Sequence, residues 1–129
     1  MAIAIIALVF GGIITGYIQA SRRAEWSGYS LAAQALATQQ LEQARSAKWD
    51  VSSIPAVDEL TNIPPVTSAV LDLPVMGTNI VRATNYTTVS LVAISAAPLV
   101  TIHLVEVNTV WPFGGKLFTN TAADYFAPD

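Results

Sequence analysis

Apolar side chains fill the start of the chain without interruption. No charged residue occurs over the 18 residues from Met1 to Ile18, and a helix of that length spans about 27 Å, close to the roughly 30 Å of a bilayer's hydrocarbon layer. Arg22 and Arg23 follow the run, whereas a cleaved secretory signal carries its basic residues before it. We therefore expect residues 1–18 to be retained as the first half of a longer helix.

A helical pattern of different polarity continues over residues 19–49. Alanine and leucine recur there at steps of three and four among glutamines, and no proline occurs before Pro55. Asp50 favours side-chain hydrogen bonds to the nearby backbone, so we expect the helix to end near Trp49. The pattern predicts one helix of about 70 Å, amphipathic in its second half. Its expected contact positions are Ala20, Ala24, Leu31, Ala35, Ala37, Leu41, Ala44 and Lys48.

The segment after the helix is rich in proline. These prolines, which favour loops and turns over regular elements, are Pro55, Pro64, Pro65 and Pro74. We expect a connecting loop over residues 50–78, with one short strand at 69–73.

The C-terminal part has the composition of β-strands. Residues 80–95, 99–111 and 116–127 are rich in Val, Ile, Thr and aromatic side chains. Gly114 and Gly115 separate the last two segments and can take the positive φ angles of a tight hairpin. Strict alternation on one strand predicts that one face of the sheet is covered; the inward positions are Val105, Val107, Thr109 and Trp111.

These patterns predict an α+β fold in three parts. A long N-terminal helix occupies residues 1–49, a Pro-rich connecting loop occupies 50–78, and an antiparallel sheet of three or four strands occupies 79–129. The amphipathic half of the helix, residues 19–49, supplies the cover for the sheet.

Composition and charge exclude several classes of function. Only 12% of the 129 residues are charged, against about 25% in average soluble domains, which reflects the apolar start. Residues 49–129 hold seven acids and two bases, so nucleic acid is not an expected partner, because phosphate binding needs clustered Lys and Arg. The absence of cysteine excludes disulfides, thiolate metal sites and thiol nucleophiles.

Two stretches resemble the type IV pilin superfamily, which comprises the pilins of bacterial filaments and the pseudopilins of type II secretion. The stretch MAIAIIALVFGGI is similar to the apolar run that follows the processed end in that family, and SLAAQALATQQLEQARSAKW is similar to its Ala- and Gln-rich continuation. The resemblance implies a structural subunit that polymerises into a type IV pilus-like filament by bundling of N-terminal helices, with the β domain outside. It also implies an inner-membrane stage, an envelope assembly machinery and a final extracellular or cell-surface location.

The resemblance assigns roles to the N-terminal residues. Gly11, Gly12 and Gly16 fall where filament helices of the family are often unwound, and each interior glycine weakens a helix by about 1 kcal/mol relative to alanine. Close helix packing at small residues is the alternative role for these glycines. The expected membrane and filament-core contacts are Ile3, Ile5, Ile6, Leu8, Val9, Phe10, Ile13 and Ile14.

Charges beside the apolar run are the second group of candidates. Arg22, Arg23 and Glu25 are expected at an interface, either with the membrane surface or with a neighbouring subunit. Positive charges after a span favour a cytoplasmic C-terminal side. In the family a basic leader precedes the span and an acid would lie two positions before Met1, so we expect the natural chain to start upstream.

Signatures of catalysis are missing from the sequence. No Ser/His/Asp order, phosphate loop or zinc spacing occurs, so we predict no enzyme activity, no catalytic residue, no metal and no cofactor. His103 is expected to be structural. A calcium site at Asp58, Glu59 and Asp72 lacks the spacing of a calcium loop.

Two surface features are left open by the sequence. Asn85 begins an Asn-Tyr-Thr glycosylation sequon in a segment expected to face outward. Aromatic side chains of the sheet are expected in the core, with an outer adhesive patch as the alternative; they are Trp111, Phe113, Phe118, Tyr125 and Phe126.

Three functional hypotheses follow from these observations. The first is the filament subunit described above. The second is a minor pilin or pseudopilin of a type II secretion system. The third, from a different class, is a single-span membrane-anchored binding module. Roles in adhesion, motility, DNA uptake or secretion are all compatible with the first two.

Overall fold

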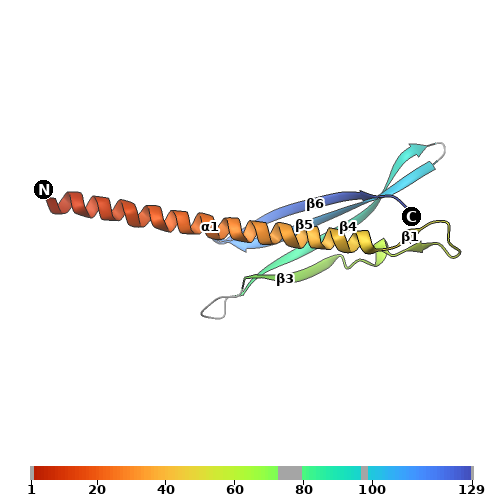
Figure 1. Ribbon diagram of the computed structural model, residues 1–129, viewed down its shortest axis with the longest axis horizontal. Coiled ribbons are helices and arrows are strands. Elements are labelled where there is room, and N and C mark those ends of the chain that lie inside the picture. The colour runs from red at the N-terminus through yellow and green to blue at the C-terminus, as the bar shows by residue number, and fades with distance from the viewer. Residues whose placement is uncertain (1, 73–79, 97–98, 129) are drawn as a thin grey trace.

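The computed structural model describes residues 2–72, 80–96 and 99–128 and shows one long helix lying across one face of an antiparallel sheet (Figure 1). The predicted α+β fold, with the helix packed on the sheet, is confirmed. The elements in chain order are α1 (Ala2–Ser46), β1 (Trp49–Asp50), β2 (Val57–Asp58), the 3-10 helix η1 (Leu60–Asn62), β3 (Val66–Asp72), β4 (Val81–Ala96), β5 (Leu99–Phe113) and β6 (Lys116–Phe126).

Helix α1 ends slightly earlier than the sequence predicts. Its last turn closes with a hydrogen bond from the Ala47 N–H to the Ala44 carbonyl of 3.1 Å. Trp49 lies outside the helix and begins β1, which pairs antiparallel with β2. Asp50 turns the chain away, because its carboxylate accepts hydrogen bonds from the backbone N–H groups of Ser52 at 2.9 Å and Ser53 at 3.1 Å.

Four strands form the main sheet in the order β3-β4-β5-β6, each antiparallel to its neighbour. A two-residue turn joins β5 to β6, with Gly114 at φ 57° and Gly115 at φ 75°, as the sequence predicts. The short strand expected at 69–73 is present as far as Asp72, but β3 begins earlier, at Val66, and pairs with β4 from Tyr86 to Val81. The rest of the expected loop at 73–78 lies outside the described residues. Alternation of smaller polar and apolar residues, rather than a run of large ones, hid the first three residues of this edge strand.

Alanines form the contact line between helix and sheet. Ala33, Ala37 and Ala44 are fully buried on α1 and face the buried side chains of β5. Small side chains let the two backbones approach closely, and Leu41, Trp49 and Leu60 fill the wider space at the far end. The predicted alternation on β5 is confirmed, since Val105, Val107, Thr109 and Trp111 are all buried.

The predicted contact stripe on α1 is partly wrong. Leu31 is 71% exposed, and Ala35 is also exposed. Both lie about 200° around the helix from Ala33 or Ala37, at 100° per residue, so they face away from the sheet. Ala20, Ala24 and Lys48 are exposed too, whereas the predicted positions Ala37, Leu41 and Ala44 do face the sheet.

Aromatic rings close the other end of the contact line. Trp111 stacks on Phe118 with ring centroids 5.0 Å apart, and Trp26 of α1 contacts both rings at about 6 Å. The Trp111 ring N–H donates to Asn120 over 2.8 Å, so its polar group is satisfied. The expected core placement is confirmed for Trp111, while Tyr125 is exposed on the outer face; Phe113, Phe118 and Phe126 are half-buried.

Ion pairs join α1 to its surroundings near its C-terminal end. Arg45 contacts Glu42 at 2.6 Å and Asp124 of β6 at 2.5 Å, and Lys48 lies 3.3 Å from Asp50. The Arg45 guanidinium, through its hydrogen bond, holds the pKa of Asp124 below its usual range. Hydrogen bonds from Ser52 lower the pKa of Asp50 to about 2.

The contact line makes a prediction about two alanines on one helix. Changing Ala37 to Leu (Ala37→Leu) should lower the free energy of unfolding by about 1–3 kcal/mol, because the larger side chain has no room against the sheet. The same change at exposed Ala35 should alter it by less than about 0.5 kcal/mol. Urea unfolding of detergent-solubilised protein, followed by tryptophan fluorescence, measures both; equal losses would place the contact line elsewhere.

Acid should weaken this end of the fold. Because the pKa values of Asp50 and Asp124 are lower in the folded chain than the ordinary value of about 3.9, their contribution to stability is complete above about pH 4 and is lost as the pH falls toward 2. The urea midpoint should drop over that interval. Asp124→Asn should flatten the drop, and an unchanged pH profile in this variant would remove Asp124 as a source.

Candidate functional site: the uncovered half of α1

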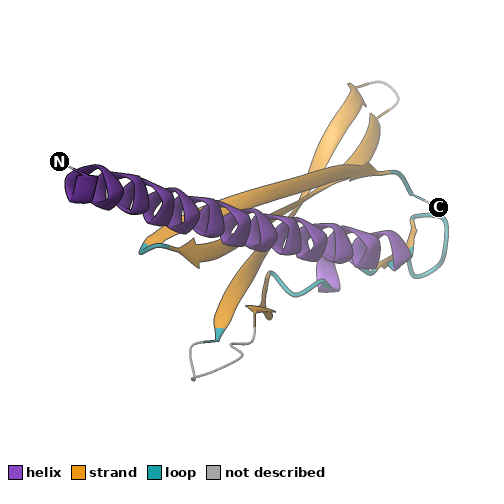
Figure 2. Cartoon of the chain, turned by 60° about the vertical axis from the view of Figure 1, so that its left-hand side comes forward, coloured by secondary structure: helices purple, strands orange, loops and turns teal. Residues whose placement is uncertain are grey.

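The first half of α1 projects beyond the sheet, and none of the residues that the structure describes covers it (Figure 1, Figure 2). Its large apolar side chains are between 46% and 83% exposed. They include all eight positions expected from the sequence in a filament core or membrane, and two more beyond them: Ile3, Ile5, Ile6, Leu8, Val9, Phe10, Ile13, Ile14, Tyr17 and Ile18. We call residues 3–18 the apolar segment.

Every side of the apolar segment is hydrophobic. At 100° per residue, Ile5, Ile6, Ile14, Ile18 and Leu8 lie at about 0°, 100°, 180°, 220° and 300° around the helix, so large apolar side chains point in all directions. A helix with one apolar stripe needs one covering partner, whereas a helix that is apolar all round is surrounded in its working state. Helix α1 contains a stretch long and apolar enough to cross a membrane.

The glycines of the apolar segment are helical in this structure. Helix α1 runs unbroken through Gly11, Gly12 and Gly16. A Cβ atom built on any of them meets no heavy atom within 4 Å outside the local helix backbone, so no contact with the described residues requires glycine there. The expected unwinding stays a prediction about an assembled state.

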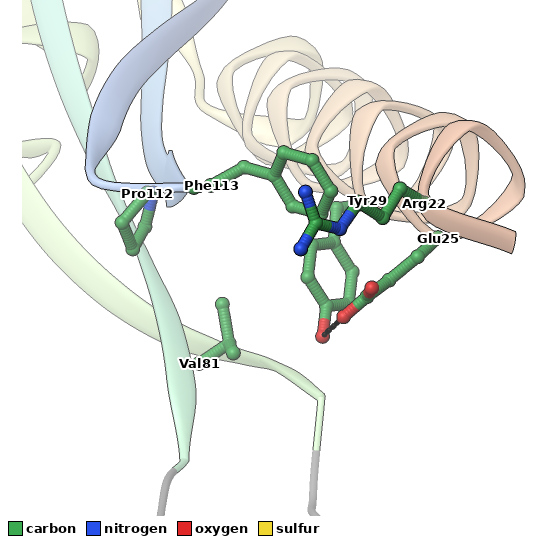
Figure 3. A pocket seen from close by; sticks show the side chains of 7 residues that line it. Arg22, Glu25, Tyr29, Val81, Pro112 and Phe113 are labelled. Carbon is green, nitrogen blue, oxygen red and sulfur yellow. Dashed lines mark hydrogen bonds between the residues drawn. The ribbon is translucent and has the colours of Figure 1, made fainter. Parts of the chain in front are cut away.

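A cleft lies where α1 leaves the sheet. It has a volume of about 540 Å³ and is lined by Arg22, Glu25 and Tyr29 of α1, by Val81 at the start of β4, and by Pro112, Phe113 and Gly114 at the end of β5 and the turn after it. Figure 3 shows the side chains of α1 facing those of the two strands across this space.

Two acids at the cleft share one hydroxyl group. The Tyr29 hydroxyl lies 2.9 Å from Asp72 of β3 and 3.3 Å from Glu25.

The expected interface charges Arg22 and Arg23 are exposed, and neither makes an ion pair among the residues that the structure describes. Glu25 is therefore partly engaged within the chain, while both arginines are available to an outside partner.

His103 has a partner that the sequence did not reveal. Its Nε2 lies 3.1 Å from the Asp58 carboxylate, and its ring contacts Trp49 with centroids 4.2 Å apart. The side chain is 3% exposed, and within the described ranges Nδ1 has no hydrogen-bond partner. The histidine therefore ties β2 to β5, which fits the structural role expected for it. Asp58 lies 45 positions earlier in the chain, and no local spacing could have linked the two.

The three acids considered for calcium do not meet. Asp58 bonds to His103, and Asp72 lies at the opposite end of the sheet beside Tyr29. Glu59 accepts a hydrogen bond from the Lys48 backbone N–H over 2.9 Å. Across the described part of the chain, no three His, Asp or Glu side chains gather in a way that could hold a metal ion.

Asn85 corrects another expectation. The residue is 5% exposed and faces α1 from β4, where its side-chain oxygen accepts a hydrogen bond from the Thr109 hydroxyl over 2.7 Å. The prediction that the sequon faces outward is wrong at Asn85, because alternation along β4 puts Tyr86, not Asn85, on the outer face. A glycan on this amide would have to displace the side chain from the core.

A second exposed apolar surface lies at the free end of the β4–β5 hairpin. Pairing of these strands continues to Ala96 and Leu99, beyond the last pair with β3 at Tyr86 and the last pair with β6 at His103. The exposed large side chains there are Leu91, Ile94, Leu99 and Val100. This end of the hairpin was not singled out by the sequence, since continuous apolar strands are normally buried on both faces.

Comparison of the chain with protein-family models, with curated proteins and with solved structures finds no significant match.

The glycines of the apolar segment are expected to set its local stability. Replacing Gly11, Gly12 and Gly16 by alanine should stabilise the helix there by about 3 kcal/mol in total, which slows backbone amide exchange of residues 11–16 by up to roughly 150-fold. Hydrogen exchange of the protein in detergent micelles measures this.

The matched control is Gly28→Ala, a helical and exposed glycine outside the apolar segment with equal room for a Cβ. It should leave exchange at residues 11–16 unchanged. Equal exchange rates in the triple variant and the parent would show that these glycines do not weaken the helix.

Proposed function

We propose that this chain is a structural subunit, not an enzyme, that polymerises into a bacterial type IV pilus-like filament. Its apolar segments bundle in the filament core, and its sheets form the outer surface. The subunit is held in the inner membrane by the same segment before assembly and reaches the cell surface as part of the filament. Partners are identical subunits and an envelope assembly machinery.

The apolar segment carries this proposal. Burial of one large apolar side chain is worth about 1.5–3 kcal/mol, and ten such side chains are exposed between Ile3 and Ile18. The free energy at stake, of the order of 15–30 kcal/mol, exceeds the net stability of a typical domain. The segment therefore does not remain in water, and only lipid or several other apolar helices can surround it.

The layout of the chain supports bundling over permanent anchoring. The sheet covers one side of the second half of α1 and leaves the opposite side free, where Leu31 and Ala35 are exposed. The chain can therefore pack by its helix while the sheet stays on the outside of a bundle, as the resemblance to pilins implies. The outer face of the sheet carries polar side chains, including an Asn108–Glu106 hydrogen bond of 2.6 Å and a Thr121–Asn108 hydrogen bond of 2.5 Å.

Shortening three side chains of the apolar segment tests the proposal. A triple variant with Ile6, Val9 and Ile13 changed to alanine keeps an uncharged helix but loses packing volume, and should reduce fibres at least tenfold. Sheared cell-surface material, examined by electron microscopy and by quantitative immunoblotting, measures the fibres. Membrane-fraction levels of the variant should stay within about twofold of the parent, since alanine still permits insertion.

The matched control truncates three exposed side chains on the outer face of the sheet: Tyr86, Leu117 and Tyr125. This variant should form fibres as the parent does. If the parent chain stays in the membrane under expression conditions and forms no fibres with or without the assembly machinery, the proposal fails and the membrane-anchored binding module replaces it.

A further inference from the structure

Basic side chains gather at the end of the sheet where α1 leaves it. Arg22 and Arg23 lie on α1, Arg82 lies at the start of β4, and Lys116 lies at the start of β6. These four residues, which we call the basic collar, are four of the six Lys and Arg residues of the chain. All four are exposed.

The collar residues lie at one level along α1. Arg22 lines the same cleft as Val81, the neighbour of Arg82, and Gly114, two residues before Lys116. Figure 1 shows the β5–β6 turn beside α1 where its free half begins, and the start of β4 at a similar level along the long axis but away from the helix. Figure 3 shows Arg22 across the cleft from Val81 and Pro112. The collar residues therefore share the level at which the projecting half of α1 begins, with Arg82 on the outer face of β4, although they are far apart in the sequence.

None of the collar cations is neutralised within the described part of the chain. The two remaining basic residues differ, since Arg45 contacts Glu42 and Asp124, and Lys48 contacts Asp50. The acids nearest the collar, Glu25 and Asp72, both lie within hydrogen-bond distance of the Tyr29 hydroxyl. This end of the fold thus carries four cations against two acids, and among the described residues no ion pair involves any of the four cations.

We propose that the basic collar binds the headgroups of anionic phospholipids while the apolar segment spans the membrane. The inference rests on the membrane stage of the proposed function and does not require the filament. Arg22 lies about 30 Å along the helix from its start, the thickness of the hydrocarbon layer, so the collar sits at the level of the lipid phosphates. Guanidinium groups bind phosphate oxygens through paired hydrogen bonds, and a nearby anionic surface attracts each cation.

The acidic end of a second copy is a less suitable partner. Acids do gather at the far end of the sheet, but those acids are already engaged: Glu42 and Asp124 with Arg45, Asp50 with Lys48, and Asp58 with His103. Contacts with the collar would have to compete with these pairs. Lipid phosphates carry no such competing partners, and they occur at the level where the collar lies.

Lipid selectivity in a reconstituted bilayer tests the inference. The full chain is placed in vesicles of phosphatidylcholine, and spin-labelled phosphatidylglycerol and spin-labelled phosphatidylcholine are compared for association with the protein by electron spin resonance. We expect a severalfold preference for phosphatidylglycerol at low salt, up to about fivefold per cation that a headgroup neutralises. The preference should fall toward one at 1 M salt, where the Debye length is about 3 Å.

Charge variants separate the collar from the chain's other cations. Arg82→Gln with Lys116→Gln should lower the preference at least twofold, while Arg45→Gln with Lys48→Gln, which removes the same charge at the far end, should leave it unchanged. Equal urea midpoints for the parent and the Arg82/Lys116 variant confirm that the fold is kept.

Three outcomes would overturn the inference. The parent could show no preference for phosphatidylglycerol at low salt, or the two double variants could lose that preference equally. The preference could also fall only when Arg22 and Arg23 are changed to glutamine and not in the Arg82/Lys116 variant. A collar variant that loses fibres without any change in lipid preference would assign the collar to contacts between subunits instead. Fibre formation by the parent chain is scored separately, so that failure of lipid binding leaves the proposed function standing.

Discussion

The architecture depends on one helix that is longer than the sheet it supports. The second half of α1 meets the sheet through fully buried alanines, whereas the first half is apolar on every side and is covered by none of the described residues. The described contacts within one chain bury apolar side chains of the second half only. The other half would have to be surrounded by lipid or by other helices, which is the basis of the proposed membrane stage and assembly.

The sheet is held on α1 by the close approach of small side chains and by contacts at both ends, more than by a large buried apolar area. Alanines bring α1 close to β5, aromatic rings close one end, and the Trp49–His103 contact closes the other. Hydrogen bonds from Asn120 to Ser30 and Gln34, of 3.2–3.4 Å, add fixed points between β6 and α1. These contacts keep a four-stranded sheet packed on α1 although the buried core between them is small.

Sequence periodicity predicted most of the fold, but it did not predict which side of α1 faces the sheet or which distant residues meet. The apolar run, the C-terminal end of the helix within three residues, the Gly114–Gly115 turn and the inward positions of β5 all follow from local patterns. The rotation of α1 against the sheet did not follow, because alanine is compatible with both a contact and an exposed position, as Ala37 and Ala35 show. The collar and the Asp58–His103 pair bring together residues that are distant in the sequence, and local patterns in a single sequence do not reveal such tertiary contacts.

Helix α1 is continuous from Ala2 to Ser46 and contains no proline, so as long as the helix stays unbroken at its glycines a rotation of one half about the helix axis also rotates the other half. Rotation of the apolar segment among its surroundings is transmitted to the sheet, which Asn120 and the aromatic rings clamp to the same helix. The angle that one half adopts therefore selects which strand edge, β3 or β6, the other half presents to its neighbours. A rotation of the apolar segment about the helix axis would therefore change the direction in which the sheet faces, some tens of ångströms away along the helix.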